Sequence, residues 1–223
     1  MKIAVIGGAG DLGSGLAMRL AKASHDVIIG SRDAGRAAEA AARLNDAAGV
    51  SNITGLDNAE AAAGGELVIL TVPYANHTAT LQLIAPHIDG KILVDVTVPL
   101  MPPKVRTVHV PEGGSAVKAG QAQLGDGVRV VSAFQNIAAA HLSDLDHDIE
   151  CDVLVCGNDK DAREVVIGLA ADIGIKAWHA GRIDNSIIAE AMTSALIFMN
   201  GHYKIHGAGL RITGAPAEET STA

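Results

Sequence analysis

The sequence predicts an α/β protein built around a doubly wound parallel sheet, with a small helical appendage at its C-terminal end. Short runs of β-branched residues alternate along the chain with stretches rich in alanine and leucine at helical spacing, which is the pattern of βαβ units. The β-branched runs are almost continuously hydrophobic, as expected of strands that helices cover on both faces. At 223 residues the chain is long enough to bury the core of such a domain.

Six strands are predicted, because each run is rich in Val, Ile or Leu and is bounded by charged residues or glycine. They begin at residues 2, 26, 66, 91, 129 and 152, and read "KIAVIG", "DVIIGS", "ELVILTV", "KILVDV", "RVVSAF" and "DVLVCG".

Three helices are predicted in the first half of the chain. The first runs from about residue 12 to residue 23, directly after a glycine-rich turn. The second lies in "RDAGRAAEAAARLNDAA", whose many alanines favour a helix. The third lies in "ANHTATLQLIAPHI", where apolar residues recur at helical spacing.

The second half of the chain is less regular. Residues 98–127 contain "VPLMPP", "PEGG" and "GDG", which predict loops with one short helix, and loops this long are often functional. A last helix is predicted from about residue 185 to residue 204, and "GAGLRI" as a closing short strand. Residues 214–223 are expected to form a flexible tail.

Composition excludes several function classes. The net charge of −8 and the pI of about 5.5 lack the basic footprint of a nucleic-acid or membrane-surface protein. No apolar run reaches the roughly 20 residues of a membrane helix, and no signal peptide is visible, so we expect a cytoplasmic protein. Cys151 and Cys156 are expected to be reduced thiols, with no disulfide and no metal site.

A glycine motif stands between the first strand and the first helix, in "IAVIGGAGDLGSGLAMRL". Gly8, Gly10 and Gly13 form G-x-G-x-x-G, which in this position is the fingerprint of a Rossmann dinucleotide-binding domain. Gly8 is expected to permit the tight turn, Gly10 to let a pyrophosphate approach the backbone, and Gly13 to let the helix pack closely on the sheet. Asp11 is expected to cap the helix with its side chain turned away and to offer its backbone N–H to the ligand.

The glycines also permit a second count, because Gly7, Gly10 and Gly13 spell G-x-x-G-x-x-G, a spacing of short-chain dehydrogenases. Those enzymes use a Tyr-x-x-x-Lys pair as a proton relay. Tyr74 and Tyr203 are each followed four residues later by a residue other than lysine, so alcohol chemistry of that type is not expected.

The end of the second strand predicts which nucleotide binds. An acidic residue there would bind the ribose 2′-hydroxyl of NAD and repel the 2′-phosphate of NADP. This chain has Ser31 and Arg32 at that place, and Arg36 follows one helical turn later. A hydroxyl and two guanidinium groups suit a phosphate dianion, so the sequence predicts NADP as the cofactor.

The stretches "GGAGDLG", "HDVIIGSRD", "ILTVP", "VVSAFQNIAA", "DVLVCGND" and "GLRITG" occur in this order over essentially the whole chain. In these motifs the chain resembles the NADPH-dependent coenzyme F420 reductase family. The resemblance implies an oxidoreductase that transfers a hydride between NADP(H) and the deazaflavin coenzyme F420, which is then the co-substrate.

The resemblance also implies site residues. NADP contacts are expected at the pyrophosphate (Ala9, Gly10, Asp11 and Leu12), at the 2′-phosphate (Ser31, Arg32 and Arg36) and near the nicotinamide (Val72, Pro73, Val98 and Ala139). The deazaflavin is expected against Gln135, Ile137 and Ala208, and Gln135 stands where the family often has histidine.

No catalytic side chain and no metal site are predicted. Direct hydride transfer needs the two reacting carbons stacked about 3 to 3.5 Å apart, and the rings themselves supply the chemistry. His77 and His141 lie near the expected loops and are interpreted as surface or hydrogen-bonded residues. His202 and His206 are four residues apart, but no third ligand accompanies them.

Two other functions stay open at this point. The first is an NADPH-dependent reductase of another small acceptor, such as a flavin, a quinone, a carbonyl or an imine. Imine reductases usually have a large helical second domain, for which the roughly 40 residues after Arg182 are too few. The second is a non-catalytic NADP sensor. A screen of electron acceptors separates the three functions.

The predicted organisation has three parts: an NADP-binding Rossmann domain in residues 1–180, a C-terminal helix and strand in residues 181–213, and the tail. The helix "SIIAEAMTSALIFMN" is apolar nearly all round, so it must be buried within its own subunit or against a partner. We therefore expect residues 181–213 to complete the acceptor site and to form the contact of a homodimer.

Overall fold

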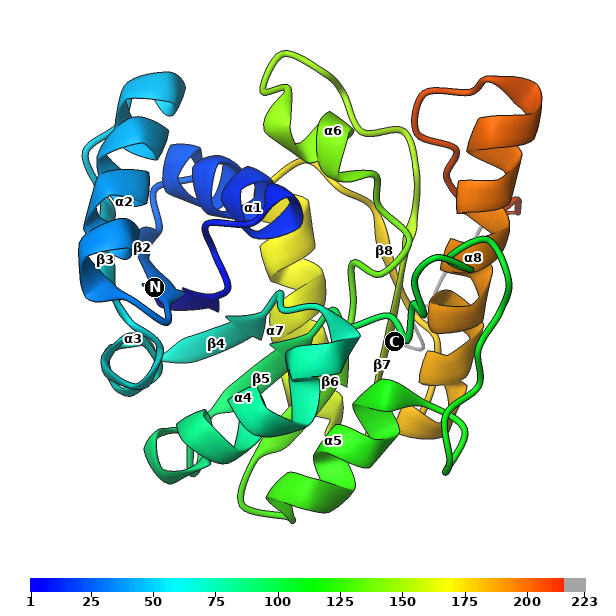
Figure 1. The fold of residues 1–223 in the computed structure, drawn as a ribbon, viewed down its shortest axis with the longest axis horizontal. Helices are drawn as coiled ribbons and strands as arrows, with labels where there is room; N and C mark the ends of the chain where they lie inside the picture. Colours follow the sequence, from blue (N-terminus) through cyan, green and yellow to red (C-terminus); the bar gives the residue numbers. More distant parts are fainter. Residues whose placement is uncertain (215–223) are drawn as a thin grey trace, which may run out of the picture.

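Eight strands form one sheet in the order β3-β2-β1-β4-β5-β6-β7-β8 in the computed structural model, which describes residues 1–214 (Figure 1). Neighbouring strands are parallel, except that β7 runs antiparallel to β6. The strands are β1 (Lys2–Ile6), β2 (Asp26–Ser31), β3 (Ile53–Asp57), β4 (Leu67–Leu70), β5 (Ile92–Asp95), β6 (Arg129–Ser132), β7 (Val153–Gly157) and β8 (Ala177–His179).

The order of the strands reverses between β1 and β4. From β1 the chain builds the sheet outward through β2 and β3, and then crosses back to add β4 and β5 on the other side of β1. Such a switch point leaves a crevice at the carboxyl ends of the strands, which is where open α/β sheets bind ligands.

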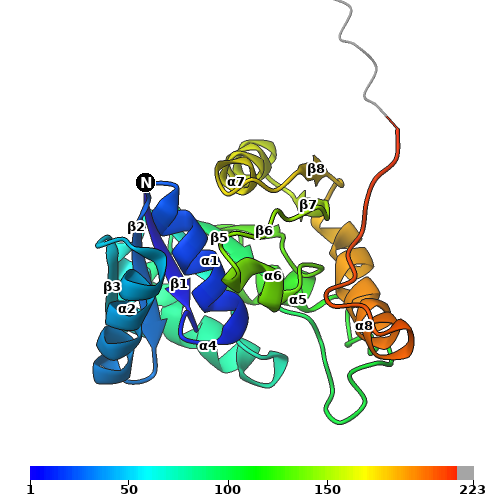
Figure 2. The same ribbon diagram turned by 90° about the horizontal axis from the view of Figure 1, so that it is seen from above.

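Helices cover both faces of the sheet (Figure 2). They are α1 (Asp11–Lys22), α2 (Ala34–Ala48), α3 (Asn58–Gly64), α4 (His77–Ile84), α5 (Ala116–Leu124), α6 (Ala139–Ser143), α7 (Lys160–Asp172) and α8 (Ser186–Tyr203), with short 3₁₀ turns η1 (Tyr74–Asn76), η2 (Ala85–His87) and η3 (Ile183–Asn185). One apolar cluster includes residues of α1, α2, α6 and α7, and a second includes residues of α3, α4 and α5. The sheet is therefore buried on both faces, as the hydrophobic strand runs predicted.

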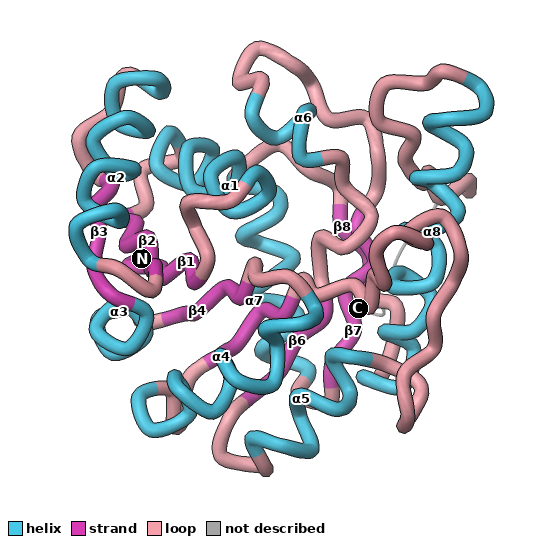
Figure 3. Tube along the Cα trace, viewed as in Figure 1, coloured by secondary structure: helices cyan, strands magenta, loops and turns pink. Residues whose placement is uncertain are grey.

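A long loop, residues 96–115, joins β5 to α5 and passes beside α8 (Figure 3). The guanidinium of Arg106 lies against Gly201 of α8, so close that a Cβ at Gly201 would come within 2.7 Å of it. The C-terminal helix thus packs against the loop that follows the centre of the sheet.

The predicted α/β fold class, the six strands and the first, second and last helices are confirmed, with ends that differ by at most two residues. The prediction missed β3 with α3, and also α6, α7 and β8. β3 lies at the edge of the sheet and only Ile53 in it is buried, so it lacks the continuous apolar run of the central strands.

The predicted closing strand in "GAGLRI" is wrong. Residues 207–212 form no strand, and their backbone is instead held by three hydrogen bonds, the first of which runs from the Ala208 N–H to Asn200 Oδ1 (2.7 Å). The backbone N–H of Asp152 donates to the Leu210 carbonyl (2.7 Å), and the N–H of Ile212 donates to Asp152 Oδ2 (2.8 Å). The Asp152 carboxylate thus accepts a hydrogen bond that, in a strand, would go to a backbone carbonyl of the neighbouring strand. Apart from Gly214, the predicted tail lies outside the described residues.

Within residues 1–214, no helix combines the length and the apolar character that crossing a bilayer requires.

Candidate functional site

Two hollows meet at the switch point of the sheet. The β2-side hollow, of about 610 Å³, is lined by Gly7, Ala9, Gly10, Gly30, Ser31, Arg32, Asn58, Val72, Pro73, Asn76, Ala79, Thr80 and Leu83. The β5-side hollow, of about 570 Å³, is lined by Gly7, Gly10, Asp11, Leu12, Thr71, Val72, Pro73, Tyr74, Ala75, Val96, Thr97, Val98, Leu100, Pro102, Val105 and Ala139. Because they share Gly7, Gly10, Val72 and Pro73, they form one continuous groove across the switch point, where α/β sheets of this kind bind dinucleotides.

The turn after β1 is made by Gly7. Gly7 has a φ of +80°, a conformation that favours glycine, and its N–H donates to the Gly30 carbonyl at 3.1 Å. Gly8 lies in the same turn, and its N–H donates to the Val5 carbonyl at 3.1 Å. A Cβ at Gly8 would lie 2.8 Å from that carbonyl and 2.7 Å from the side chain of Ile29, so Gly8 also permits the turn, as expected.

Gly10 and Gly13 differ in what surrounds them. A Cβ at Gly10 would meet only the Gly7 carbonyl, at 3.4 Å, so its open side faces the groove. A Cβ at Gly13 would lie 2.6 Å from Thr71 Oγ1 and 2.8 Å from the Gly8 Cα. Gly13 thus allows α1 to pack closely, as predicted, whereas nothing in the fold itself demands a glycine at Gly10.

The N-terminus of α1 points into the groove. Its N-cap is Gly10, which has no side chain to cap with, so the prediction that Asp11 caps the helix is wrong. Asp11 is the first helical residue, is exposed and lines the β5-side hollow. The first bond at this end runs from the Ser14 N–H to the Gly10 carbonyl (2.8 Å), so the preceding N–H groups have no partner in the helix and suit an anion.

Ser31 and Arg32 line the β2-side hollow, and Arg36 is exposed one turn into α2. Asp33 caps α2 by accepting a hydrogen bond from the Arg36 N–H (2.8 Å), which fixes the start of the helix beside the two arginines. Neither Arg32 nor Arg36 forms a salt bridge with another residue in the part of the chain that the structure describes. Both guanidinium groups are therefore available to an anionic ligand.

The β5-side hollow has mostly apolar walls, including Val72, Val98 and Ala139. Ala139 is the first residue of α6, and Arg19 of α1 holds the segment that contains it. The Arg19 guanidinium donates to the carbonyls of Leu142 (2.9 Å), His141 (2.8 Å), Asp144 (2.6 Å) and His147 (2.8 Å). This clamp keeps α6 against α1 and places Ala139 at the groove.

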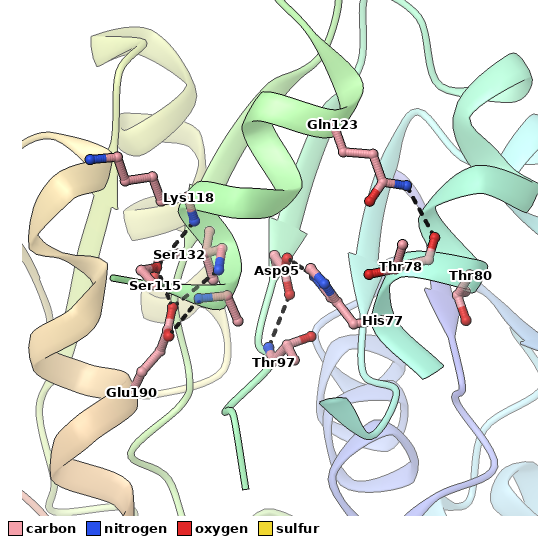
Figure 4. Close-up of polar contacts among 12 residues, drawn as sticks. His77, Thr78, Thr80, Asp95, Thr97, Ser115, Lys118, Gln123, Ser132 and Glu190 are labelled. Carbon is pink, nitrogen blue, oxygen red and sulfur yellow. Dashed lines mark hydrogen bonds and ion pairs between the residues drawn. The ribbon is translucent and has the colours of Figure 1, made fainter. Parts of the chain in front are cut away.

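A buried His–Asp pair joins the start of α4 to the end of β5, beside the groove (Figure 4). His77 Nε2 lies 2.6 Å from Asp95 Oδ2, and Asp95 Oδ1 accepts a hydrogen bond from the Thr97 N–H at 3.0 Å. Burial acts to lower the pKa of His77, but the hydrogen bond with Asp95 and the charges of Asp95 and Glu190 raise it above its ordinary value. The interpretation of His77 as a hydrogen-bonded residue fits this geometry, in which the pair positions Thr97 and Val98.

A second buried carboxylate lies on α8 (Figure 4). Glu190 accepts hydrogen bonds from Ser115 Oγ (2.6 Å) and from the N–H groups of Ala116 (2.8 Å) and Val117 (3.1 Å) at the start of α5. Burial raises the pKa of Glu190 above its ordinary value, although these hydrogen bonds oppose the shift. The contact fixes α8 to α5 and is structural.

The three residues predicted for the deazaflavin are dispersed. Gln135 is buried and donates to the Asp95 carbonyl (2.8 Å) and to Ser132 Oγ (2.9 Å), and Ile137 is buried in the core. Ala208 is half-buried in a separate hollow of about 320 Å³ that His141 and Arg211 also line. Within residues 1–214 no group of three or more His, Cys, Asp or Glu side chains is placed to hold a metal ion.

Asn58 and Thr97 also line the groove, and the sequence analysis did not name either of them. Asn58 follows β3, the strand that was missed, and Thr97 lies between Asp95 and the predicted Val98. A polar residue directly after the end of a parallel strand was the signal for both.

Known proteins similar to this chain include NADP reductases, which is consistent with a dinucleotide-binding groove. The model of the family described as "NADP oxidoreductase coenzyme F420-dependent" matches residues 2–99. The F420-dependent NADP reductase of Methanocaldococcus jannaschii is 44% identical over 221 residues, which cover 96% of this chain and 98% of that protein. That of Methanothermobacter thermautotrophicus is 41% identical over 226 residues, covering 98% and 97%.

A crystal structure of a candidate F420-dependent NADP reductase from Arthrobacter sp. FB24 is similar over 96% of this chain and 100% of that chain, with a TM-score of 0.82 and 28% identity. The similarity in sequence and in fold extends over nearly the full length of these relatives. The chain therefore belongs to the family of coenzyme F420-dependent NADP oxidoreductases.

Proposed function

We propose that this protein is an oxidoreductase that transfers a hydride directly between NADP(H) and coenzyme F420. The observation that carries the proposal is the continuous groove across the switch point, which has a helix N-terminus at its middle and Arg32, without a salt bridge to any described residue, at one end. The relatives that are named F420-dependent NADP reductases support the same pair of substrates.

In this proposal the NADP pyrophosphate lies at Ala9 to Leu12, against the open side of Gly10 and the first N–H groups of α1. The 2′-phosphate is bound by Ser31, Arg32 and Arg36. The nicotinamide occupies the β5-side hollow, whose walls include Val72, Pro73, Val98 and Ala139. Gln135, Ile137 and Ala208 remain the proposed contacts of the deazaflavin.

When both are bound, the two rings would supply the redox chemistry: NADPH would give a hydride from C4 of its nicotinamide, and the deazaflavin would take that hydride together with one proton from water. The protein contributes position. The apolar walls of the β5-side hollow hold a ring face and exclude water, while the Asp95–Thr97 hydrogen bond holds the strand end that carries Val98. No side chain is assigned a proton-transfer role.

The purified protein is expected to oxidise NADPH when F420 is the acceptor and not when a flavin, a quinone, a carbonyl or an imine replaces it. The measurement is the loss of reduced-nicotinamide absorbance with each acceptor in turn. Faster oxidation with another acceptor would identify a different reductase. NADPH binding without turnover by any acceptor would favour an NADP sensor instead.

Removing an acid or base that lies near the groove and is only partly buried is expected to leave the chemical step within about tenfold of the unmodified rate, since general acid–base catalysis contributes about 10²- to 10⁴-fold. Suitable variants are Tyr74→Phe and His141→Ala, because His77 is buried and its loss would strip Asp95 of its partner. Single-turnover rates with C4-deuterated NADPH measure the step.

Direct transfer also requires a large isotope effect and recovery of the label on the acceptor. A thousandfold loss in either variant, or label lost to water, would reveal a proton-transfer residue that the geometry does not show.

The protein is expected to be a homodimer that buries α8. One side of α8 packs inside its own subunit through Ala189, Glu190 and Leu196, while Ile188 and Phe198 remain about half exposed. Exposed apolar residues on one helix favour a partner surface. Light scattering at micromolar concentration is expected to give twice the mass of the chain, and a monomer mass would contradict the proposal.

We further propose a division of the chain into two parts and a cellular location. Residues 1–180 are the NADP-binding domain, and residues 181–213 complete the acceptor site and the dimer contact. The location is cytoplasmic, which the free thiols of Cys151 and Cys156 support, because disulfides are rare in reducing compartments.

A further inference from the structure

The side-chain oxygen of a buried asparagine in the β2-side hollow has no hydrogen-bond partner within residues 1–214. Asn58 is only 6% exposed, and its Oδ1 has no donor among the described residues. Buried polar side-chain atoms are nearly always paired, because leaving one unpaired costs the desolvation of that atom. An unpaired amide that lines a hollow is therefore expected to gain its partner from a ligand.

The local fold does not need Asn58. The N-cap of α3 is Asp57, whose Oδ1 accepts the N–H groups of Ala59 (2.8 Å) and Glu60 (2.9 Å). Gly30 leaves space for the amide, since a Cβ at Gly30 would lie 2.8 Å from Asn58 Oδ1. The amide thus lies directly beside the strand end that leads to Ser31 and Arg32.

The same hollow has an apolar wall that the fold leaves open. Leu83 is 49% exposed although it is a large apolar residue of α4, and it lines the hollow together with Val72, Pro73 and Ala79. Arg32 also lines this hollow, and a planar guanidinium stacks well on an aromatic face. These surfaces suit a flat ring better than a phosphate or a sugar.

We propose that Asn58 binds the amine-bearing edge of the adenine base of NADP, and that Leu83, Ala79 and Pro73 form the wall on which the base lies. A carboxamide carries an acceptor and a donor side by side, as does this edge of adenine, and paired Asn–adenine hydrogen bonds are a known recognition mode. The 2′-phosphate is a poorer match for Asn58, because it offers no donor to the unpaired oxygen. The assignment rests on the proposed function, in which NADP occupies this groove.

The test compares NADP⁺ with its 1,N6-etheno analogue, in which a two-carbon bridge covers that edge of the base. Affinities are measured by calorimetry with the whole protein and no acceptor. The unmodified protein is expected to bind NADP⁺ at least about tenfold more tightly than the analogue. Asn58→Leu, which keeps the shape without polar atoms, is expected to lose about two- to tenfold in NADP⁺ affinity and to reduce this discrimination.

Two further measurements and a control variant separate base recognition from a structural role, alongside the discrimination against the etheno analogue. The ratio of NADP⁺ to NAD⁺ affinity is expected to stay unchanged in Asn58→Leu, because the 2′-phosphate contacts remain. The melting temperature of the ligand-free variant is expected not to fall, since an unpaired buried acceptor has been removed. Glu60→Ala, at an exposed position on the same helix, is the matched control and is expected to leave all three values unchanged.

A reduced preference for NADP⁺ over NAD⁺ with base discrimination intact would place Asn58 at the 2′-phosphate and overturn the assignment. Unchanged discrimination in both Asn58→Leu and Asn58→Ala would overturn it as well. These failures differ from that of the proposed function, which would appear as normal nucleotide binding without hydride transfer to F420.

Discussion

Replacing Gly10 with valine is expected to abolish NADP binding while the protein still folds. Gly10 has a φ of −81° and a ψ of 168°, an extended conformation that valine adopts without strain. A Cβ there would meet only the Gly7 carbonyl, at 3.4 Å, so the methyl groups would project into the groove where the two hollows meet. They would occupy the proposed place of the pyrophosphate and would cover the N-terminus of α1.

Gly13→Val is the matched control for that experiment. A Cβ at Gly13 would lie 2.6 Å from Thr71 Oγ1 and 2.8 Å from the Gly8 Cα, so this variant is expected to lose stability. Calorimetric titration with NADP⁺ and thermal unfolding, done on both variants, separate the two effects. If Gly10→Val binds NADP⁺ within about tenfold of the unmodified protein, the pyrophosphate does not lie at Gly10.

Removing the Arg32 side chain is expected to weaken NADP binding by about ten- to a hundredfold and to leave NAD binding nearly unchanged. A charge-assisted hydrogen bond contributes about 1.5 to 3 kcal/mol, which corresponds to that range of affinity. Arg32 lines the β2-side hollow beside Ser31 and forms no salt bridge with another described residue, so its loss removes a ligand contact and breaks no internal ion pair.

Titration of the unmodified protein and of Arg32→Ala with both nucleotides measures this effect. Arg43→Ala is the control, because Arg43 is exposed on α2, two turns beyond Arg36, and lies outside the groove. Equal affinity of the unmodified protein for NADP and NAD would contradict the assignment of the 2′-phosphate to this strand end.

Much of the fold followed from patterns local in sequence. The strands at the centre of the sheet are fully buried, so each carries an uninterrupted apolar run that identifies it. β3 lies at the edge and needs no such run, and α3 has only seven residues, so neither carried a strong signal. The prediction of a strand in "GAGLRI" was wrong for the opposite reason: the segment is apolar, but the backbone N–H of Ile212 donates to the Asp152 carboxylate and not to a neighbouring strand.

The candidate site, like the fold, could be predicted from the sequence only in part. Gly10 of the glycine motif lines the same hollow as Ser31 and Arg32, because the carboxyl ends of parallel strands meet at one edge of a sheet, and their roles in binding NADP stay predictions. The division of labour between Gly7 and Gly8 was not predictable, since the positive φ at Gly7 and the contact of Gly8 with Ile29 depend on where β2 lies. Asp11 was predicted to be the N-cap of α1, but an N-cap is the last residue with non-helical backbone angles. Gly10 has those angles, and Asp11 is already helical.

By itself, then, the sequence determined the fold class, the position of the nucleotide motif and the arginines expected to select NADP. Apolar strand runs, glycine spacing and charge can be identified from residue types within short segments, without knowledge of tertiary contacts. Tertiary structure alone decided that His77 pairs with Asp95, that Glu190 joins α8 to the start of α5, and that Asn58 Oδ1 is buried without a hydrogen-bond partner among the described residues. The two partners of each of these hydrogen bonds are at least 18 positions apart in the sequence. The surroundings of Asn58 depend on a hollow that several elements line together. Their burial and hydrogen bonding exist only once the helices have packed on the sheet.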